Sequence, residues 1–221
     1  MEIEQIFFGI PPITRYYLLA ISCVSIATTF ELLSPLSLYL NWRLILEEGE
    51  VWRLVSCFVF FGPLNFHLFL QLHFIYMYLS SLESHFYINR TLDCIVMLIV
   101  AALELFLIAK WSDQFFFLGS SLSMMLVYLW SRRFPDEILH VFGLVQVGAP
   151  YLPYVMLGIN WMMNMDSNSP HGGLGAIHHE LMAIAAGHVL WYVSEIVPKI
   201  TGVDVMRMPG RLILAAFPML R

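Results

Sequence analysis

Polar side chains that could take part in nucleophilic catalysis lie in three otherwise apolar stretches of this chain. They are His67 and Gln71 in the first stretch, Ser121 in the second, and His179 and Glu180 in the third. A histidine that accepts the proton of a serine hydroxyl makes that oxygen a nucleophile, and a side-chain amide stabilises the oxyanion that then forms. These residue types make acyl transfer one candidate chemistry, on condition that the fold brings the three stretches together.

Metal binding is a second chemistry that the histidines could support. His179 and Glu180 begin an H-E-x-x-H pattern, in which two histidines one helical turn apart bind zinc. The fifth position of the pattern is Ala183, however, and the other histidines do not complete a helical zinc spacing. The three cysteines are scattered in or beside apolar segments, without metal-ligand spacing. We therefore expect no metal and no other cofactor.

The composition places the chain in the membrane class. Of its 221 residues, 59% are hydrophobic and 12% are charged, whereas soluble proteins average roughly 25% charged residues. A soluble domain of this composition would have too little polar surface to cover itself. The net charge of -5 comes without a basic stripe or tail, so nucleic acid is not an expected partner. In the absence of a long polar linker, residues 1–221 are expected to form a single domain.

Apolar segments recur along the chain and predict an all-α membrane protein, a bundle of six spans. The six segments are Tyr16–Phe30, Leu54–Leu82 with a break at Gly62-Pro63, Cys94–Ala109, Phe115–Trp130, Tyr151–Met163 and Leu181–Val197. A full span needs roughly 20 helical residues, and the third, fourth and fifth segments are shorter than that. Either the helices extend beyond these boundaries, or the nearby bilayer is thinned to match them.

The positions of lysine and arginine predict the orientation of the bundle. With the N-terminus in the cytosol, eight of these residues fall on the cytosolic side and three on the other side. An even number of spans then places both termini in the cytosol. The loop between the first two spans contains an amphipathic piece, Leu36–Leu46, which we expect to lie in the membrane interface.

The order of the motifs resembles that of the Derlins, which are rhomboid-like pseudoproteases of the endoplasmic reticulum, and the resemblance covers nearly the whole chain. The residues that carry it are I-P-x-x-T-R at 10–15, Trp52-Arg53, Leu82-Glu83, Tyr128-Leu129-Trp130 and Ala183-x-x-x-Gly187-His188. The H-x-x-x-Q pattern at His67 resembles the H-x-x-x-N oxyanion motif of rhomboids. The resemblance implies a six-span rhomboid-like bundle.

The same comparison with rhomboid proteases implies a lost catalytic site. Those proteases carry G-x-S-G around the nucleophile, but Leu122 follows Ser121 here, and Glu180 stands where their catalytic histidine would be. An imidazole can accept and donate protons near neutral pH. A carboxyl group can do so only if its pKa is raised far above its usual value. Ser121, Glu180, His67 and Gln71 are therefore interpreted as degenerate catalytic positions, and we expect that the protein is not an enzyme.

The resemblance also implies roles for residues outside the catalytic positions. Trp52-Arg53 is expected to hold the lumenal loop at the headgroup level, and small residues to permit close packing of the sixth span. Carboxylates inside or near the spans are expected to face the bundle or a polar cavity rather than lipid. The packing residues are Ala183, Gly187 and His188, and the cavity candidates are Glu83, Glu104 and Glu195.

The function implied by the resemblance is a part in endoplasmic-reticulum-associated degradation. Derlins help move misfolded proteins to the cytosol alongside a membrane RING ubiquitin ligase. The expected partners are misfolded lumenal or membrane clients, that ligase complex and the lipid bilayer. Contact with the AAA ATPase is expected to be indirect, because the chain ends soon after its sixth segment. Assembly into a homo-oligomer stays open, and the expected location is the endoplasmic reticulum membrane, as a multi-pass protein.

Two alternatives stay open from the sequence. The first is an active rhomboid-type intramembrane serine protease, which would require that Ser121 and His179 meet in space. His179 is one residue from Glu180, or about 100° around a helix. The second is a scaffold that binds membrane clients without moving them.

The predicted orientation is tested by the one glycosylation sequon of the chain, Asn89-Arg90-Thr91. It lies in a predicted cytosolic loop, out of reach of lumenal glycosylation. We expect no glycan on Asn89 in cells. The measurement is the electrophoretic mobility of the protein before and after glycosidase treatment. A glycosidase-sensitive shift that is lost in Asn89→Gln would reverse the orientation.

Overall fold

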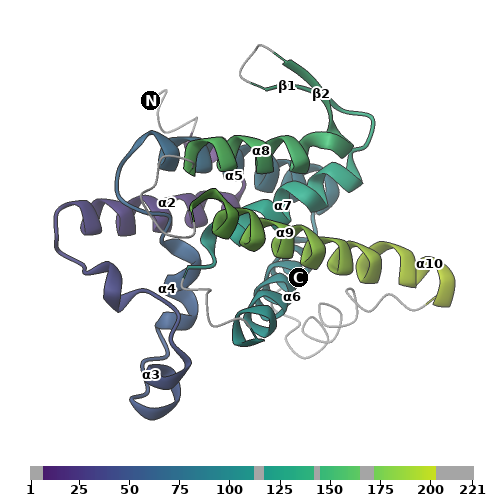
Figure 1. Ribbon diagram of the computed structural model, residues 1–221. Coiled ribbons are helices and arrows are strands. Elements are labelled where there is room, and N and C mark those ends of the chain that lie inside the picture. The colour runs from purple at the N-terminus through teal and green to yellow at the C-terminus, as the bar shows by residue number, and fades with distance from the viewer. Residues whose placement is uncertain (1–6, 112–116, 142–144, 165–171, 203–221) are drawn as a thin grey trace.

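The computed structural model describes residues 7–111, 117–141, 145–164 and 172–202, and helices make up most of these ranges (Figure 1). The α-helices are α2 (Pro12–Thr29), α3 (Trp42–Glu47), α4 (Arg53–Val59), α5 (Phe66–Ser81), α6 (Thr91–Trp111), α7 (Gly119–Arg133), α8 (Leu152–Asn164), α9 (Gly172–Trp191) and α10 (Val197–Thr201). Short 3-10 helices are η1 (Pro35–Ser37) and η3 (Ala149–Tyr151), and π-helices are η2 (Leu82–Phe86) and η4 (Tyr192–Ile196).

A two-stranded hairpin departs from the predicted all-α class. Strands β1 (Ile138–Val141) and β2 (Val145–Gly148) pair antiparallel between α7 and α8. Both strands carry β-branched residues, which favour extended backbone. The hairpin and α3 project from the helices on opposite sides of the molecule (Figure 1), so the hairpin adds no layer to the bundle.

Helix α7 forms the centre of the bundle. Every residue from Ser121 to Ser131 is buried, and α7 contacts α5, α6, α8 and α9 (Figure 1). Its side chains are apolar or small around the whole circumference, which is the pattern of a helix with no exposed face. The depth and rotation of α7 therefore determine where its neighbours lie.

The second apolar segment of the sequence forms two helices, α4 and α5. The chain between them is not helical, and the break includes Gly62, whose φ of 115° is accessible to glycine. Asn65 then begins α5, because its side chain accepts a hydrogen bond of 2.8 Å from the Leu68 amide. The predicted break at Gly62-Pro63 thus separates α5 from a short helix that precedes it.

The lengths of the helices correct one prediction. The third segment was predicted to be shorter than a full span, but α6 has 21 residues because the helix continues through polar residues at both ends. Helices α7 and α8 have 15 and 13 residues. Within the described ranges, two helices are long and apolar enough to cross a bilayer, Thr91–Trp111 with a mean hydropathy of 2.6 and Ile177–Thr201 with 1.4.

A carboxylate from a distant helix caps the beginning of α2. Pro12 has no amide hydrogen, and the Arg15 amide bonds to the carbonyl of Pro11, which leaves the amides of Ile13 and Thr14 without helical partners. Glu83 accepts a hydrogen bond of 2.9 Å from each of them and a third from the Thr14 hydroxyl. This buried cap joins the I-P-x-x-T-R motif to the Leu82-Glu83 motif.

Helices α5, α7 and α9 run in the same direction. Trp130 near the end of α7 donates a hydrogen bond of 2.9 Å to Ser81 at the end of α5. Arg133 at the end of α7 lies 3.4 Å from Glu195, beyond the end of α9. At the opposite end, residues near the starts of α5 and α7 and in the first half of α9 line one cavity. The connecting helices α6 and α8 therefore run in the reverse direction.

The buried guanidinium of Arg133 lies between the two π-helices. Its side chain is 2% exposed, and its Nε atom is 3.4 Å from an oxygen of Glu195 in η4. The ring centroid of Phe86 in η2 is 3.9 Å from the Arg133 Cζ atom. A buried cation requires such compensation, so Arg133 joins the ends of α5, α7 and α9.

The cap on α2 predicts a loss of stability in Glu83→Gln. The replacement has a similar size, but one carboxylate oxygen becomes an amide that faces N–H donors. An unmade buried hydrogen bond costs about 1–3 kcal/mol, so the variant should denature at a lower temperature in detergent. Glu48→Gln is the control, because Glu48 is exposed. Equal melting temperatures for both variants would mean that the cap does not stabilise the fold.

Candidate functional site

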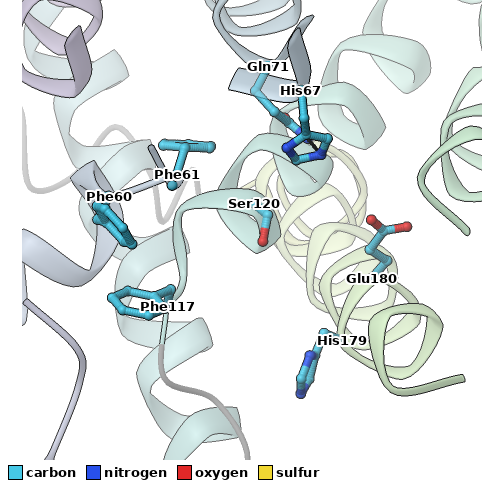
Figure 2. Close-up of a pocket in the computed structure, with 9 residues that line it drawn as sticks. Phe60, Phe61, His67, Gln71, Phe117, Ser120, His179 and Glu180 are labelled. Atoms are coloured by element: carbon cyan, nitrogen blue, oxygen red, sulfur yellow. Dashed lines mark hydrogen bonds between the residues drawn. The ribbon is translucent and has the colours of Figure 1, made fainter. Parts of the chain in front are cut away.

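A cavity with a volume of about 340 Å³ lies between the starts of α5 and α7 and the first half of α9 (Figure 2). Its walls combine aromatic rings with polar side chains. The lining residues are Phe60, Phe61, Gly62, His67, Gln71, Phe117, Ser120, His179 and Glu180. The fold therefore brings together the three polar stretches that the sequence singled out.

His67 and Gln71 form the α5 wall of the cavity. They are one helical turn apart, and the Nε2 atoms of their side chains are 3.5 Å apart. Gln71 is 4% exposed. The Asn65 cap determines where α5 begins, so it also determines the level at which these two side chains reach the cavity.

Ser120, rather than Ser121, is the serine of α7 that lines the cavity. Ser121, which the sequence pattern places at the degenerate nucleophile position, is 2% exposed and is not among the lining residues. Consecutive residues of a helix point about 100° apart. Ser121 lies seven residues before Tyr128, which places it on the face of α7 that packs against α9.

The rotation of α7 at this end depends on Gly119. A Cβ atom at this position would lie 2.8 Å from the ring of Phe61 and 3.1 Å from the carbonyl oxygen of Phe58. The amide of Leu118 also donates a hydrogen bond of 2.8 Å to the carbonyl of Cys57. The start of α7 is thus fixed against the end of α4, and a side chain at 119 would displace it.

The α9 wall of the cavity contains Glu180 and His179. Asn160 of α8 donates a hydrogen bond of 2.6 Å to Oε1 of Glu180, and both residues are buried. Sequence reasoning did not find Asn160, although an amide inside an otherwise apolar segment is the signal that would have indicated it. The bond holds the carboxylate in the bundle and connects α8 to α9.

Ser120 and His179 both line the cavity but are not paired. Within the residues that the structure describes, no hydrogen bond joins the two side chains, and Figure 2 draws them apart without a dashed line between them. A serine nucleophile requires a base within hydrogen-bond reach, which is about 2.6–3.2 Å. The geometry therefore contains the residue types for acyl transfer without the bond that would activate the serine.

In the ranges 7–111, 117–141, 145–164 and 172–202, no group of three or more histidine, cysteine, aspartate or glutamate side chains is placed to hold a metal ion.

The comparison with known proteins assigns the chain to a family. A sequence profile of the Der1-like family matches residues 10–210. The chain belongs to the Der1-like family. Derlin-2.2 of Zea mays is 30% identical over 218 residues, which cover 94% of this chain and 84% of that protein. Derlin-1 of Arabidopsis thaliana is 31% identical over 209 residues, 93% and 74% of the two chains. The probable derlin-2 homolog of Dictyostelium discoideum is 27% identical over 215 residues, 95% and 81%. The resemblance read from the motifs is confirmed.

The Trp52-Arg53 motif of this Der1-like chain organises the loop between α2 and α5. Arg53 is 5% exposed and donates hydrogen bonds of 2.9 and 3.1 Å to the carbonyls of Leu36 and Tyr39. Its Nε atom pairs with Glu50. Trp52 is 53% exposed, which suits an interfacial ring. Arg53 thus supports the loop from inside, and Trp52 faces outward.

The Gly187-His188 motif packs α9 onto α7 through Tyr128. A Cβ atom at Gly187 would lie 3.1 Å from the Tyr128 ring, and Ala183 one turn earlier is fully buried. The Tyr128 hydroxyl lies 2.6 Å from Nδ1 of His188 and accepts a hydrogen bond from Arg132. The Y-L-W and G-H motifs of this family are therefore two sides of one contact.

The three glutamates named as cavity candidates are not among the residues that line the cavity. Glu83 caps α2 at the opposite end of the bundle, and Glu195 pairs with Arg133 there. Glu104 lies within α6, where its Oε2 atom is buried without a hydrogen-bond partner among the described residues. The positions of these glutamates in the sequence did not show at which end of the bundle each one lies.

The Tyr128 contact predicts that Gly187→Leu separates α9 from α7. Overpacking of a tight interface costs typically about 1–3 kcal/mol, so the melting temperature in detergent should fall. Val189→Leu is the matched control on the same helix, because Val189 is 53% exposed. If Gly187→Leu melts with the parent protein, the close approach seen here does not contribute to stability.

Proposed function

We propose that this protein is a non-catalytic Derlin-like membrane protein that assists the movement of misfolded proteins from the endoplasmic reticulum to the cytosol for degradation by the ubiquitin–proteasome system. The observation that carries the proposal is the family match over residues 10–210 together with the cavity between α5, α7 and α9, which has polar lining residues. The match to the Der1-like family supports a role associated with endoplasmic-reticulum-associated degradation. The movement of clients and the absence of catalysis are the further parts of the proposal.

The proposed arrangement in the membrane has six crossings, by α2, α5, α6, α7, α8 and α9. The directions of α5, α7 and α9 and the capping of α2 by Glu83 support this alternation. The end with Arg90, Arg132 and Arg133 faces the cytosol, because cationic residues favour that side. The cavity end then faces the lumen of the endoplasmic reticulum, and both termini lie in the cytosol.

A pseudoprotease explains the cavity better than an active protease does. Ser120 has no hydrogen bond to His179, and the residue that follows Ser121 is a buried leucine. Glu180 is held by Asn160 instead of pairing with a serine. The presence of Ser120 and His179 in one cavity is the observation that favours the protease alternative, so that alternative has its own test below.

The proposed mechanism lowers the cost of moving polar chain through the bilayer. Each backbone group without a hydrogen-bond partner in hydrocarbon costs several kcal/mol. The amide, hydroxyl and carboxylate groups of Gln71, Ser120 and Glu180 offer partners inside the bundle. Helices of 15 and 13 residues, α7 and α8, span roughly 20 Å at 1.5 Å per residue. They favour local thinning of the bilayer, which shortens the path.

The proposed partners are misfolded lumenal or membrane clients and a membrane RING ubiquitin ligase that modifies them as they emerge. The AAA ATPase would act through this assembly, and a second copy of the chain is a further candidate partner. These partners follow from the family role rather than from a surface that the structure marks for them.

The test of this function is client turnover in cells that lack the endogenous homologue. The parent protein should shorten the half-life of a misfolded lumenal client, and Val189→Leu should do the same. Gly187→Leu should insert, because leucine is favourable in lipid, yet fail to restore turnover. Clients that crosslink to the protein while their half-life stays unchanged with the parent would favour the scaffold alternative and contradict the proposal.

A peptidase assay decides between this function and the protease alternative. The purified protein in liposomes should leave transmembrane substrates intact and should not react with serine-directed phosphonates. Both Ser120→Ala and Ser121→Ala are needed, because Ser120 lines the cavity and Ser121 occupies the serine position of the G-x-S pattern. Cleavage that is lost in either variant would identify an active enzyme.

A further inference from the structure

The charge of the cavity is unbalanced. Among the described residues that line the cavity, Glu180 is the only one with a carboxylate, and none is a lysine or an arginine. Asn160 donates one hydrogen bond to Oε1 of Glu180, which orients the carboxylate without neutralising it. A cation beside a sheltered carboxylate stabilises its charged form. The site therefore favours a positively charged group over a neutral or negative one.

Aromatic rings face Glu180 across the cavity. Phe60, Phe61 and Phe117 occupy one side and Glu180 the other, with Ser120 and Gln71 between them (Figure 2). The ring centroids of Phe60 and Phe117 are 4.8 Å apart, so these two rings pack against each other. Aromatic faces attract ammonium and guanidinium groups and also pack against apolar stems. Carboxylate, amide oxygen and aromatic rings together match a cation carried on a hydrocarbon chain.

We propose that this cavity binds the lysine or arginine side chain of an apolar client segment, with the cationic group at Glu180 and the stem against the phenylalanines. The inference rests on the proposed function and names the feature of the client that is recognised. The cavity, at about 340 Å³, accommodates a side chain but not a helix, which is about 10–12 Å across. Ser120 is exposed, so the cavity opens to the surface.

The physical driving force explains why such clients would be selected. A lysine or arginine in hydrocarbon is unfavourable, and assembled membrane proteins pair it with a partner inside the bundle. A segment that has lost its partner exposes the charge to lipid. Transfer of that side chain into a cavity with a carboxylate relieves the cost, so the site would distinguish unassembled segments from assembled ones.

The direct test is binding of synthetic peptides to the full-length protein in nanodiscs of phosphatidylglycerol. The peptides are identical apolar helices of about 20 residues with lysine, leucine or glutamate at one central position. A desolvated charge-assisted contact with an aromatic contribution should make the lysine peptide bind about tenfold tighter than the leucine peptide, or more. Equal affinities for the lysine and leucine peptides would overturn the proposal.

Two variants locate the effect in the cavity. Glu180→Gln keeps an oxygen that accepts the bond from Asn160 but removes the charge, so the preference for lysine should disappear while the leucine peptide binds as before. Phe117→Leu keeps the charge and should weaken the preference. Glu48→Gln, an exposed position, should retain it. A lysine preference that survives Glu180→Gln would place the recognition elsewhere and would contradict the proposal.

Lipid headgroups also carry ammonium groups, and a second nanodisc composition separates them from clients. Replacing phosphatidylglycerol by phosphatidylcholine should leave the preference for the lysine peptide in place. A preference that vanishes in phosphatidylcholine would mean that the cavity takes the headgroup, and the client proposal would fail.

Measurements of client turnover test the proposed function independently of the proposed lysine site. In cells, Glu180→Gln should slow the degradation of a membrane client with an intramembrane lysine and spare the same client with leucine there. If the parent restores turnover but the peptides bind equally, the function stands and this inference fails. If the parent restores no turnover while Glu180-dependent lysine binding is present, the function fails and the site stands.

Discussion

The contact of the Tyr128 ring with the backbone at Gly187 is the constraint on which the rest of the site depends. It fixes the distance between α7 and α9, because a Cβ atom at 187 would already lie 3.1 Å from the ring. Glu180 precedes Gly187 by seven residues, or two turns, and therefore shares its face of α9. The packing that brings Gly187 onto α7 thus also directs Glu180 into the bundle. At the other end of α7, Gly119 allows a second close approach, to Phe61 and the Phe58 carbonyl.

Charged side chains bind backbone groups or other helices at the points where helices begin and end. Glu83 satisfies the free amides of α2, Arg53 binds two carbonyls of the loop before α4, and Arg133 joins the ends of three helices. The contacts of Glu83 and Arg133 join residues that are far apart in the sequence, whereas Arg53 acts within one loop. A buried polar backbone group without a hydrogen-bond partner costs free energy, and these side chains supply partners or ion pairs where the helices do not.

The cavity combines features that a purely structural core would avoid. A buried carboxylate, two imidazoles and an amide lie beside aromatic rings, although polar groups inside a bundle cost free energy unless they are compensated. The cavity lies where the polar stretches that contain His67, Ser120 and His179 converge. In the function proposed here, such a cavity would bind a chain segment and release it intact. In the orientation proposed here, the short helices α7 and α8 would also thin the adjacent bilayer.

The sequence by itself determined the family, the helical class and the break before α5, because these depend on local composition and on motif order. It also singled out His67, Gln71 and Glu180, which line the cavity, Ala183, which is buried, and Gly187, which packs against Tyr128. The tertiary structure decided which side chains meet. Ser120 replaced Ser121 in the cavity, since close packing at Gly119 sets a rotation that no spacing rule contains. Asn160 joined the site from α8, and Glu83 and Glu195 moved to the opposite end of the bundle. These outcomes depend on the direction and depth at which helices pack, and contacts between residues up to 70 positions apart leave no local pattern from which to read them.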